Sequence, residues 1–484
     1  MANAIEGLEP ASVWKHFADL TAIPRGSKHE EKAAAFVIGH ARRLGLEWRQ
    51  DATGNVVVRK PATRGHENAP SICLQGHLDM VNEKHPHVVH DFTKDPLKLV
   101  REGDILRADG TTLGADNGIA VATNLALMDD RTLAHGPLEF LFTVDEETGL
   151  TGANGLDGSL IASRTLLNLD SEEEGSLFVG CSGGIDSSGV WPLERDPAPA
   201  GAVAVEVKVG GLRGGHSGLE IDKGRGNAVK LLTRAVATLV PLGARIARMD
   251  GGNKRNAIPR DAVALVLVPK RRFDETLAAI QAFHDTARAE LASVEPALAI
   301  GAEPVKARGA RVWKRALEKR VLRVLAGLPH GVIKMSADIP GLVETSTNLA
   351  SIATQAKQIV VATSQRSSVA SEKDEIAAGV RAIFELGGAT VTGSDGYPGW
   401  KPNLQSRVLQ HAVATYRKIS GREPEVKAIH AGLECGIIGE KVPGMDMVSF
   451  GPTLEGVHSP DEKIHIGSVA KYWEFLTTLL ADWK

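Results

Sequence analysis

An apolar run that ends in three adjacent carboxylates constrains this chain more than any other stretch. Residues 138–144 are mostly apolar, and their Phe, Leu and Val content predicts a short buried strand. Asp145, Glu146 and Glu147 follow at once. Anions at the end of a buried strand repel one another strongly unless a cation or a shared proton compensates them. The stretch is therefore either a solvated turn, the usual outcome for an acidic triplet, or part of a cation site.

The size and charge of the chain favour a soluble enzyme-sized protein without a nucleic-acid partner. Its 484 residues suffice for two to four ordinary domains, and 43% hydrophobic with 24% charged residues is typical of globular proteins. A net charge of −3 gives no basic surface for nucleic acid. Cys73, Cys181 and Cys435 are odd in number and far apart, which argues against a disulfide framework or a thiolate zinc site.

No targeting segment or membrane span is apparent in the sequence. The first twenty residues carry charges early and lack an apolar core of the signal-peptide kind. No uncharged apolar run reaches the length that a transmembrane helix needs. We therefore expect a cytoplasmic protein with no membrane partner.

Two different strand patterns divide the chain. In the first part and the last part, short apolar strands alternate with helices, as in a parallel α/β sheet; strands are predicted at 71–75, 138–144, 166–170 and 445–450. Between them, the segment VAVEVKV (203–209) alternates apolar and polar residues, which is typical of an antiparallel strand with one exposed face. The sequence thus predicts an α/β fold: a mostly parallel-sheet domain of residues 1–186 and 394–484, interrupted by an antiparallel α+β insert at 187–393.

Side chains that bind metals collect at the ends of the predicted strands and in the turns of the α/β part: His77, Asp79, Asp116, Glu146, Glu147, Asp170 and His458. In open parallel sheets, sites form at the carboxyl ends of the strands. Two imidazoles with several carboxylates suit a pair of divalent ions, Zn²⁺ above all, with Mn²⁺ or Co²⁺ feasible. A bridging carboxylate would hold such ions roughly 3.5–4 Å apart, as in hydrolytic two-metal sites. Taken singly, each of these residues is more often a cap or turn residue, and the metal interpretation rests on their occurring together.

Five motifs together resemble the M20 metallopeptidase family. They are GHLDMV (76–81), TTLGADNGIA (111–120), FTVDEETGLTGA (142–153), LLNLDSEE (166–173) and GPTLEGVHSPDE (451–462). Their order and contexts match from end to end, and the resemblance covers nearly the whole chain, including the insert. Within the family, the Xaa-His (aminoacyl-histidine) dipeptidases are the most similar group.

The resemblance implies a catalytic domain with two zinc ions per subunit, for which Co²⁺ or Mn²⁺ can substitute. The implied ligands are His77 and Asp170 on one ion, Glu147 and His458 on the other, and Asp116 between them. Asp79 resembles the aspartate that orients the imidazole of His77, and Glu146 resembles the general base. A cis peptide at Asp116-Asn117 is implied as well. Asp145 matches no family role, and we interpret it as a turn or backbone-capping residue.

For the insert, the resemblance implies a lid and dimerisation domain that completes the substrate site. His216, in GGHSG (214–218), resembles a lid histidine that stabilises the oxyanion and that can come from the neighbouring subunit in dimeric relatives. Arg366 resembles an arginine that binds the substrate carboxylate. Asn256 and, in the last part of the chain, Glu434 are weaker candidates for substrate binding. The alternatives are a Gly-rich turn for His216, a surface arginine for Arg366 and a helix cap for Glu434.

These features predict a zinc-dependent dipeptidase that cleaves unblocked dipeptides, with histidine favoured at the C-terminal position and carnosine-like substrates possible. We expect a homodimer that forms through the insert. Two alternatives stay open. One is an N-acyl amino acid deacylase (aminoacylase) on the same site, which a free-amine and an N-acyl substrate would distinguish. The other is a non-catalytic, metal-stabilised peptide-binding protein, which the presence of Glu146 disfavours.

Overall fold

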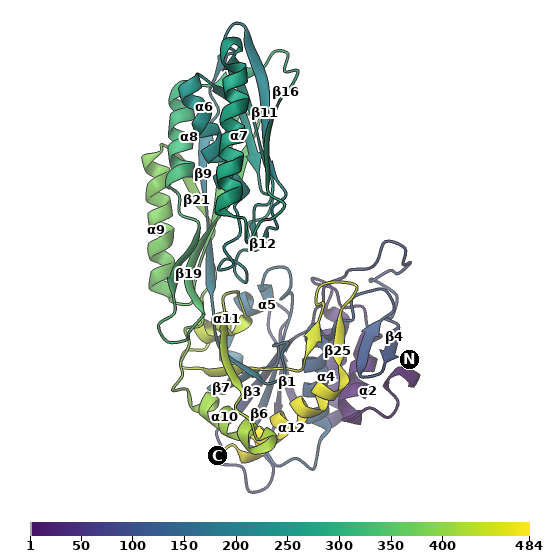
Figure 1. Cartoon of the computed structure of the whole chain (residues 1–484). Helices are drawn as coiled ribbons and strands as arrows, with labels where there is room; N and C mark the ends of the chain where they lie inside the picture. The colour runs from purple at the N-terminus through teal and green to yellow at the C-terminus, as the bar shows by residue number, and fades with distance from the viewer. Residues whose placement is uncertain (1) are drawn as a thin grey trace. The chain divides into compact units, whose positions relative to one another are not determined.

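The computed structural model describes residues 2–484, which form two compact units (Figure 1). The first unit comprises the described residues up to Gly180, then Trp400–Ala428 and Leu433–Lys484. The second unit comprises Cys181–Gly399 and Ile429–Gly432. The sequence placed the divisions at 186/187 and 393/394, and it did not anticipate that residues 429–432 belong to the second unit.

An eight-stranded sheet forms the centre of the first unit. Its order is β1 (Glu47–Gln50), β2 (Val56–Lys60), β6 (Leu138–Thr143), β3 (Ile72–His77), β7 (Thr165–Asn168), β23 (Asp446–Ser449), β8 (Ser176–Cys181) and β22 (Glu425–Ile429). The four strands in the middle, from β6 to β23, run parallel, whereas β1 and β2 are antiparallel to their neighbours. The predicted parallel sheet is confirmed, and the apolar run at 138–144 is one of its central strands.

The helices of the first unit come from both parts of the chain that form it. They are α1 (Ala2–Ile5), α2 (Ala11–Thr21), α3 (Glu31–Leu44), α4 (Ala115–Asp129), α5 (Thr151–Gly155), α10 (Arg407–Ser420), α11 (Glu434–Lys441) and α12 (Ile466–Asp482). Helix α4 is buried along almost its whole length, as its Ala, Val and Leu content predicts, and it contacts α2 and β3. Gly45 ends α3 with φ of 70°, the left-handed cap position that favours glycine.

A small four-stranded sheet completes this unit. Strands β4 (Leu99–Glu102) and β5 (Ile105–Ala108) form a hairpin, and β25 (Lys463–His465) and β24 (Leu454–Glu455) continue it. The segment between β24 and β25 carries His458.

The second unit is built on a nine-stranded antiparallel sheet, with α6 (Ala228–Leu239), α7 (Phe273–Glu290), α8 (Arg315–Gly327) and α9 (Ala370–Leu386) packed on one face (Figure 1). The strands are β16 (Ala299–Pro304), β11 (Ala202–Gly210), β15 (Ala262–Pro269), β13 (Arg245–Gly251), β19 (Val343–Thr354), β20 (Gln358–Ser367), β9 (Gly183–Pro192) and β21 (Thr390–Gly393), with β18 (Gly331–Met335) paired to β19. Val205, Val207 and Val209 of β11 point into the core, so the predicted alternation is confirmed.

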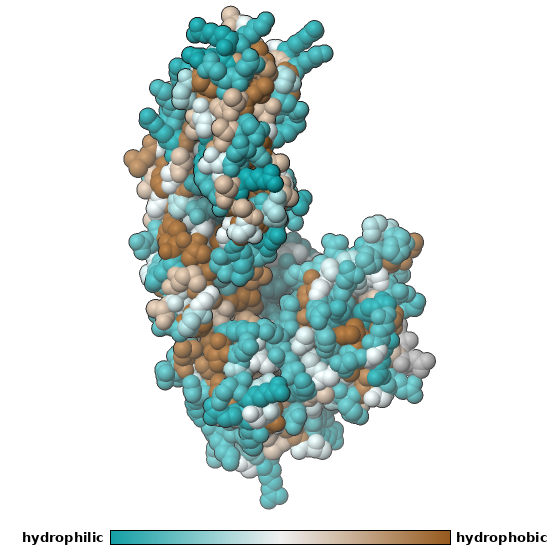
Figure 2. Space-filling view, viewed as in Figure 1, coloured by the Kyte–Doolittle hydropathy of each residue, from teal (hydrophilic) through white to brown (hydrophobic). Residues whose placement is uncertain are grey.

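The surface of the described chain is mostly hydrophilic, with apolar groups exposed over the second unit (Figure 2). Of the large apolar side chains that are exposed, all but Val89 and Leu404 belong to the second unit. None of the helices between residues 2 and 484 is long and apolar enough to cross a membrane.

Candidate metal centre

His77, the last residue of β3, contacts three carboxylates at the carboxyl end of the parallel strands. Its Nδ1 atom lies 3.1 Å from Oδ1 of Asp79. Its Nε2 atom lies 3.0 Å from Oδ1 of Asp116 and 3.5 Å from Oδ1 of Asp170. The ring is 1% exposed. Asp79 therefore holds one nitrogen of the imidazole, which leaves the other facing Asp116 and Asp170.

A second group of metal-binding side chains shares Asp116 with the first. The Nε2 atom of His458 lies 3.1 Å from Oδ2 of Asp116 and 2.9 Å from Oε2 of Glu147. Asp116 presents one oxygen to each histidine, an arrangement that is compatible with the bridging role that the resemblance implies. One ligand atom from each of His77, Asp116 and Asp170 lies within 4.8 Å of the others, and the same holds for Asp116, Glu147 and His458.

The electrostatics of these side chains fit divalent cations. Burial, with Asp116 and Glu147 close by, raises the pKa of Asp170 to about 7 against the opposing effect of His77. Hydrogen bonds to Asp116 and Glu147 raise the pKa of His458 to about 11. Oε1 of Glu147 and Oδ1 of Asp170 are buried and accept no hydrogen bond. Buried carboxylate oxygens without partners are costly, and a hard or borderline cation satisfies them.

The N-terminus of α4 is held by a carboxylate that the sequence analysis did not single out. Glu462 accepts hydrogen bonds from four successive backbone N–H groups, those of Leu113 (2.8 Å), Gly114 (2.9 Å), Ala115 (2.8 Å) and Asp116 (3.3 Å). These donors are unpaired in an ordinary helix start, so the carboxylate fixes the segment that carries Asp116. Glu462 lies in the motif GPTLEGVHSPDE, but nothing in its spacing reveals this contact.

The peptide bond Asp116-Asn117 is cis, as the resemblance implied. The side chain of Asn117 accepts a hydrogen bond from the backbone N–H of His77 at 3.1 Å and donates to the carbonyl of Leu169 at 2.9 Å. Asn117 therefore ties the turn of Asp116 to β3 and to the residue that precedes Asp170.

The backbone N–H groups of the acidic turn after β6 donate hydrogen bonds to carboxylates from other segments. Asp79 accepts the N–H of Glu146 at 3.0 Å and that of Glu147 at 3.1 Å, and Glu30 accepts the N–H of Asp145 at 3.2 Å. Asp145 has φ of 48°. Its carboxylate accepts hydrogen bonds from the hydroxyls of Thr148 and Thr151, both at 2.5 Å. The interpretation of Asp145 as a turn residue is confirmed; Glu30 was missed, because it lies on a different segment.

Glu146 combines burial with several negative neighbours. Burial, together with Asp170, Glu434 and Glu147, raises its pKa well above the ordinary carboxyl value, and His77 opposes that rise. A carboxyl group in this setting holds a proton more readily than a solvated one, which suits a group that accepts a proton and returns it.

Glu434, at the start of α11, is completely buried. One of its oxygens accepts hydrogen bonds from Nε2 of Gln75 at 2.6 Å and from Oγ1 of Thr143 at 2.7 Å, whereas Oε1 has no partner. Burial raises its pKa to about 7. Because the carboxylate bonds to strand side chains, the helix-cap interpretation is wrong, and an unsatisfied acceptor remains beside the centre.

His216 lies in the second unit, in the short strand β12 (Gly215–His216). Its Nδ1 atom accepts hydrogen bonds from the backbone N–H groups of Gly218 (3.2 Å) and Leu219 (3.1 Å), which places the ring proton on Nε2. Burial and the positive charge of Arg366 lower its pKa to about 4. At neutral pH the side chain is therefore an uncharged hydrogen-bond donor through Nε2.

Arg366 and Asn256 also belong to the second unit. Arg366, on β20, is 7% exposed and donates to Oη of Tyr397 at 2.8 Å, while its Nε has no partner. It is not a surface arginine. The side chain of Asn256 is exposed, and its backbone carbonyl accepts the N–H of Ser217 at 2.8 Å. Tyr397 carried no motif and was missed.

The fold and the first unit's side chains define a metal-dependent hydrolase of the α/β type, with two histidine–carboxylate groups that share one aspartate. The chain belongs to the peptidase family M20/M25/M40, whose family model matches residues 73–482. The protein is therefore an enzyme, and membership of this metallopeptidase family implies that it uses divalent metal ions.

Individual relatives match over the full length. The chain is 41% identical over 481 residues to the cytosol non-specific dipeptidase of Escherichia coli (strain K12), covering 99% of both chains. The crystal structure of aminoacylhistidine dipeptidase from Vibrio alginolyticus superimposes with a TM-score of 0.92 at 40% identity, covering 99% of this chain and 98% of that one. The aminopeptidase PepT from Bacillus cereus, at 18% identity and a TM-score of 0.57, shares the fold.

Proposed function

We propose that this protein is a zinc-dependent dipeptidase that hydrolyses unblocked dipeptides and favours Xaa-His substrates, carnosine-like ones included. The observation that carries the proposal is the pair of metal-binding groups that share Asp116 and lie beside the buried carboxyl of Glu146. The names of the two full-length relatives support dipeptides as the substrate class. One name says non-specific and the other aminoacylhistidine, so the preference for histidine is the finer part of the proposal.

The residues that would hold the metal ions are those predicted from the sequence. His77 and Asp170 would hold one ion, Glu147 and His458 the other, and Asp116 both. When bound, two divalent ions polarise the scissile carbonyl and make a water acidic enough to attack it. Zn²⁺ suits this mixture of nitrogen and oxygen donors, and Co²⁺ or Mn²⁺ are the substitutes we expect.

The proton chemistry falls to Glu146. Its carboxylate takes a proton from the attacking water and later gives it to the departing amine. Asp79 positions this base, because the same carboxylate that orients the ring of His77 also accepts the N–H groups of Glu146 and Glu147. Asp79 thus fixes both the proposed ligand His77 and the proposed base Glu146.

Candidate substrate-binding side chains occur in each unit. Nε2–H of His216 would stabilise the developing oxyanion, since that ring is neutral with its proton on Nε2. Arg366 would bind the substrate carboxylate, assisted by Asn256. Glu434 would accept the free α-amino group with its unpartnered oxygen.

A homodimer formed through the second unit is part of the proposal. Strand β18 pairs only with β19 among the described strands, so one edge is open. Val332, Ile333 and Met335 on this strand are 36%, 47% and 43% exposed. An open apolar edge favours pairing with another chain. A cytoplasmic location agrees with the name of the E. coli relative.

Two substrates that differ only at the amine test the reaction. An Xaa-His dipeptide and its N-acetylated form are assayed side by side on the zinc-loaded protein. We expect hydrolysis of the free amine only, because Glu434 would meet an uncharged acetamide in the other. Equal rates, or a faster N-acetyl substrate, would instead indicate a deacylase. No hydrolysis of either, with tight binding of the dipeptide, would indicate a peptide-binding protein.

The origin of His216 is tested by mixing. Glu146→Gln and His216→Ala variants, each nearly inactive alone, regain part of the wild-type rate in mixed dimers if His216 acts in the neighbouring subunit. Mixtures that stay inactive place it in its own subunit.

A further inference from the structure

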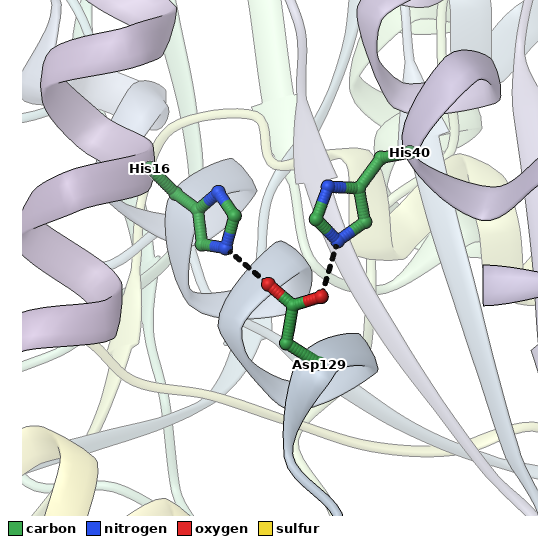
Figure 3. Close-up of side chains that lie close together, drawn as sticks. All are labelled: His16, His40 and Asp129. Atoms are coloured by element: carbon green, nitrogen blue, oxygen red, sulfur yellow. Dashed lines mark hydrogen bonds and ion pairs between the residues drawn. The ribbon is translucent and has the colours of Figure 1, made fainter. Parts of the chain in front are cut away.

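A second cluster of metal-binding side chains lies in the first unit, on helices rather than strand ends (Figure 3). His16 on α2, His40 on α3 and Asp129 at the end of α4 point toward one another. Nε2 of His16 is 2.7 Å from Oδ2 of Asp129, and Nε2 of His40 is 3.0 Å from Oδ1. Asp116 lies in the first turn of α4 and Asp129 is its last residue, so at about 1.5 Å per residue the cluster lies roughly 20 Å from the candidate metal centre.

The two imidazole rings of the cluster are buried, whereas its carboxylate is partly exposed to solvent. His16 and His40 are 4% and 1% exposed, whereas the side chain of Asp129 is 37% exposed. Nδ1 of His16 and Nε2 of His40 are buried and make no hydrogen bond of acceptable geometry. The nitrogen of His40 that points at Asp129 is therefore close to the carboxylate without being well bonded to it.

The donor set matches a three-ligand divalent site. One ligand atom from each of the three side chains lies within 4.8 Å of the other two. Zinc takes imidazole nitrogens and carboxylate oxygens at about 2.0–2.2 Å, and sites with three protein ligands keep a water in the fourth position. The exposed side of Asp129 gives both the ion and that water a route from solvent.

Arg43 determines what an ion must displace. The Nη2 atom of Arg43 donates a hydrogen bond to Nδ1 of His40 at 2.6 Å. Without an ion, the ring proton of His40 therefore lies on Nε2. If a cation binds Nε2 of His40, the ring proton must lie on Nδ1 instead. Nδ1 then no longer accepts a hydrogen bond from Arg43, and the guanidinium has to move away from it. Arg43 is exposed, so its side chain is free to move into solvent.

We propose that His16, His40 and Asp129 form a separate, non-catalytic binding site for a divalent cation of the zinc type, with Arg43 as a competing positive charge. The ion joins α2, α3 and the end of α4. This site is independent of the dipeptidase proposal, because no residue of the candidate metal centre contributes to it.

Counting ions tests the proposal without using activity as the readout. Full-length wild type and Asp129→Asn are stripped with a chelator, dialysed against zinc chloride and analysed for zinc per chain. We expect Asp129→Asn to bind one ion fewer per chain and to keep its dipeptidase rate within about twofold. Asp19→Asn, which removes an exposed charge from α2, is the matched control and keeps the wild-type count. Equal zinc counts in wild type and Asp129→Asn would overturn the proposal.

A second variant keeps the test decisive if Asp129→Asn fails to fold. Arg43→Gln removes the competing charge from an exposed position. We expect zinc affinity at this site to rise by about tenfold, the lower end of the change in affinity that residues bonded to a metal ligand produce. If Arg43→Gln binds no zinc beyond the ions of the candidate metal centre, the three side chains form a hydrogen-bonded cluster only.

Discussion

The two histidine–carboxylate clusters of the first unit differ in charge balance. In the metal centre, five carboxylates surround two imidazoles, and buried oxygens of Glu147 and Asp170 remain without hydrogen bonds. In the helical cluster, one carboxylate lies between two imidazoles, and the nitrogens are the unsatisfied atoms. An excess of buried carboxylates is costly unless cations neutralise it. A cluster whose positive and negative groups nearly balance is stable without a cation, although it can bind one. Changes in the first should therefore abolish function, and changes in the second should alter ion content alone.

The largest effect is expected from Asp116→Asn. Because Asp116 presents an oxygen to each histidine, its loss removes a ligand from both groups, and we expect zinc content at the centre and hydrolysis to fall together. Metal analysis and a dipeptide assay check this. Full zinc content with normal turnover in Asp116→Asn would refute the shared-ligand arrangement, and Asp129→Asn is the contrasting variant.

A smaller effect is expected from His216→Ala, about 10²–10³-fold in kcat, as for other oxyanion donors. The lowered pKa of His216, about 4, means that the ring loses its proton as pH rises through 4 and is neutral above pH 5. The loss should therefore be the same at pH 6 and pH 8. A loss that grows as pH falls below 6.5 would instead identify a positively charged ring.

Glu434→Gln tests whether an acid outside the ligand set serves the substrate. Loss of a charged hydrogen bond costs about 1.5–3 kcal/mol, so we expect kcat/KM for free-amine dipeptides to fall about 10–100-fold through KM. Zinc content should not change. An increase in KM of the same size for substrates without an amine would mean that Glu434 acts on the fold of the site rather than on the amine.

Glu30→Ala should have the smallest effect among these acids. Its carboxylate accepts the backbone N–H groups of Lys28 and Asp145, so its removal leaves buried donors without partners. We expect the free energy of unfolding to fall by about 1–3 kcal/mol, measured by urea titration. The rate should fall as well, since the turn that carries Glu146 loosens. A stability equal to that of wild type would show that Asp79 alone holds the turn.

The sequence predicted the first unit better than the second. Apolar strands such as 138–143 bury both faces and leave a strong local signal, and the candidate ligands His77, Glu147 and Asp170 lie at or shortly after the ends of such strands. In the second unit, α8, β13 and the exposed strand β18 were missed, although Leu317, Val321, Val324 and Leu325 of α8 do share one helix face.

Contacts between distant segments were beyond sequence reasoning. Glu30 and Glu462 act on backbone N–H groups, and such contacts leave no side-chain pattern at the partner position. His16, His40 and Asp129 come from three helices, so no local spacing connects them. Apolar residues elsewhere on α2 and α4 pack these two helices together, and α3 contacts α4 as well.

The most direct test of the account is to measure zinc content and dipeptide turnover together in Glu146→Gln. This change keeps the shape of the side chain and leaves every proposed ligand in place. The account predicts wild-type zinc content and a loss of kcat of roughly 10²–10⁴-fold, the range for removal of a general base. Turnover near the wild-type rate with full zinc content would contradict the assignment of Glu146 as the base, and with it the proposed mechanism.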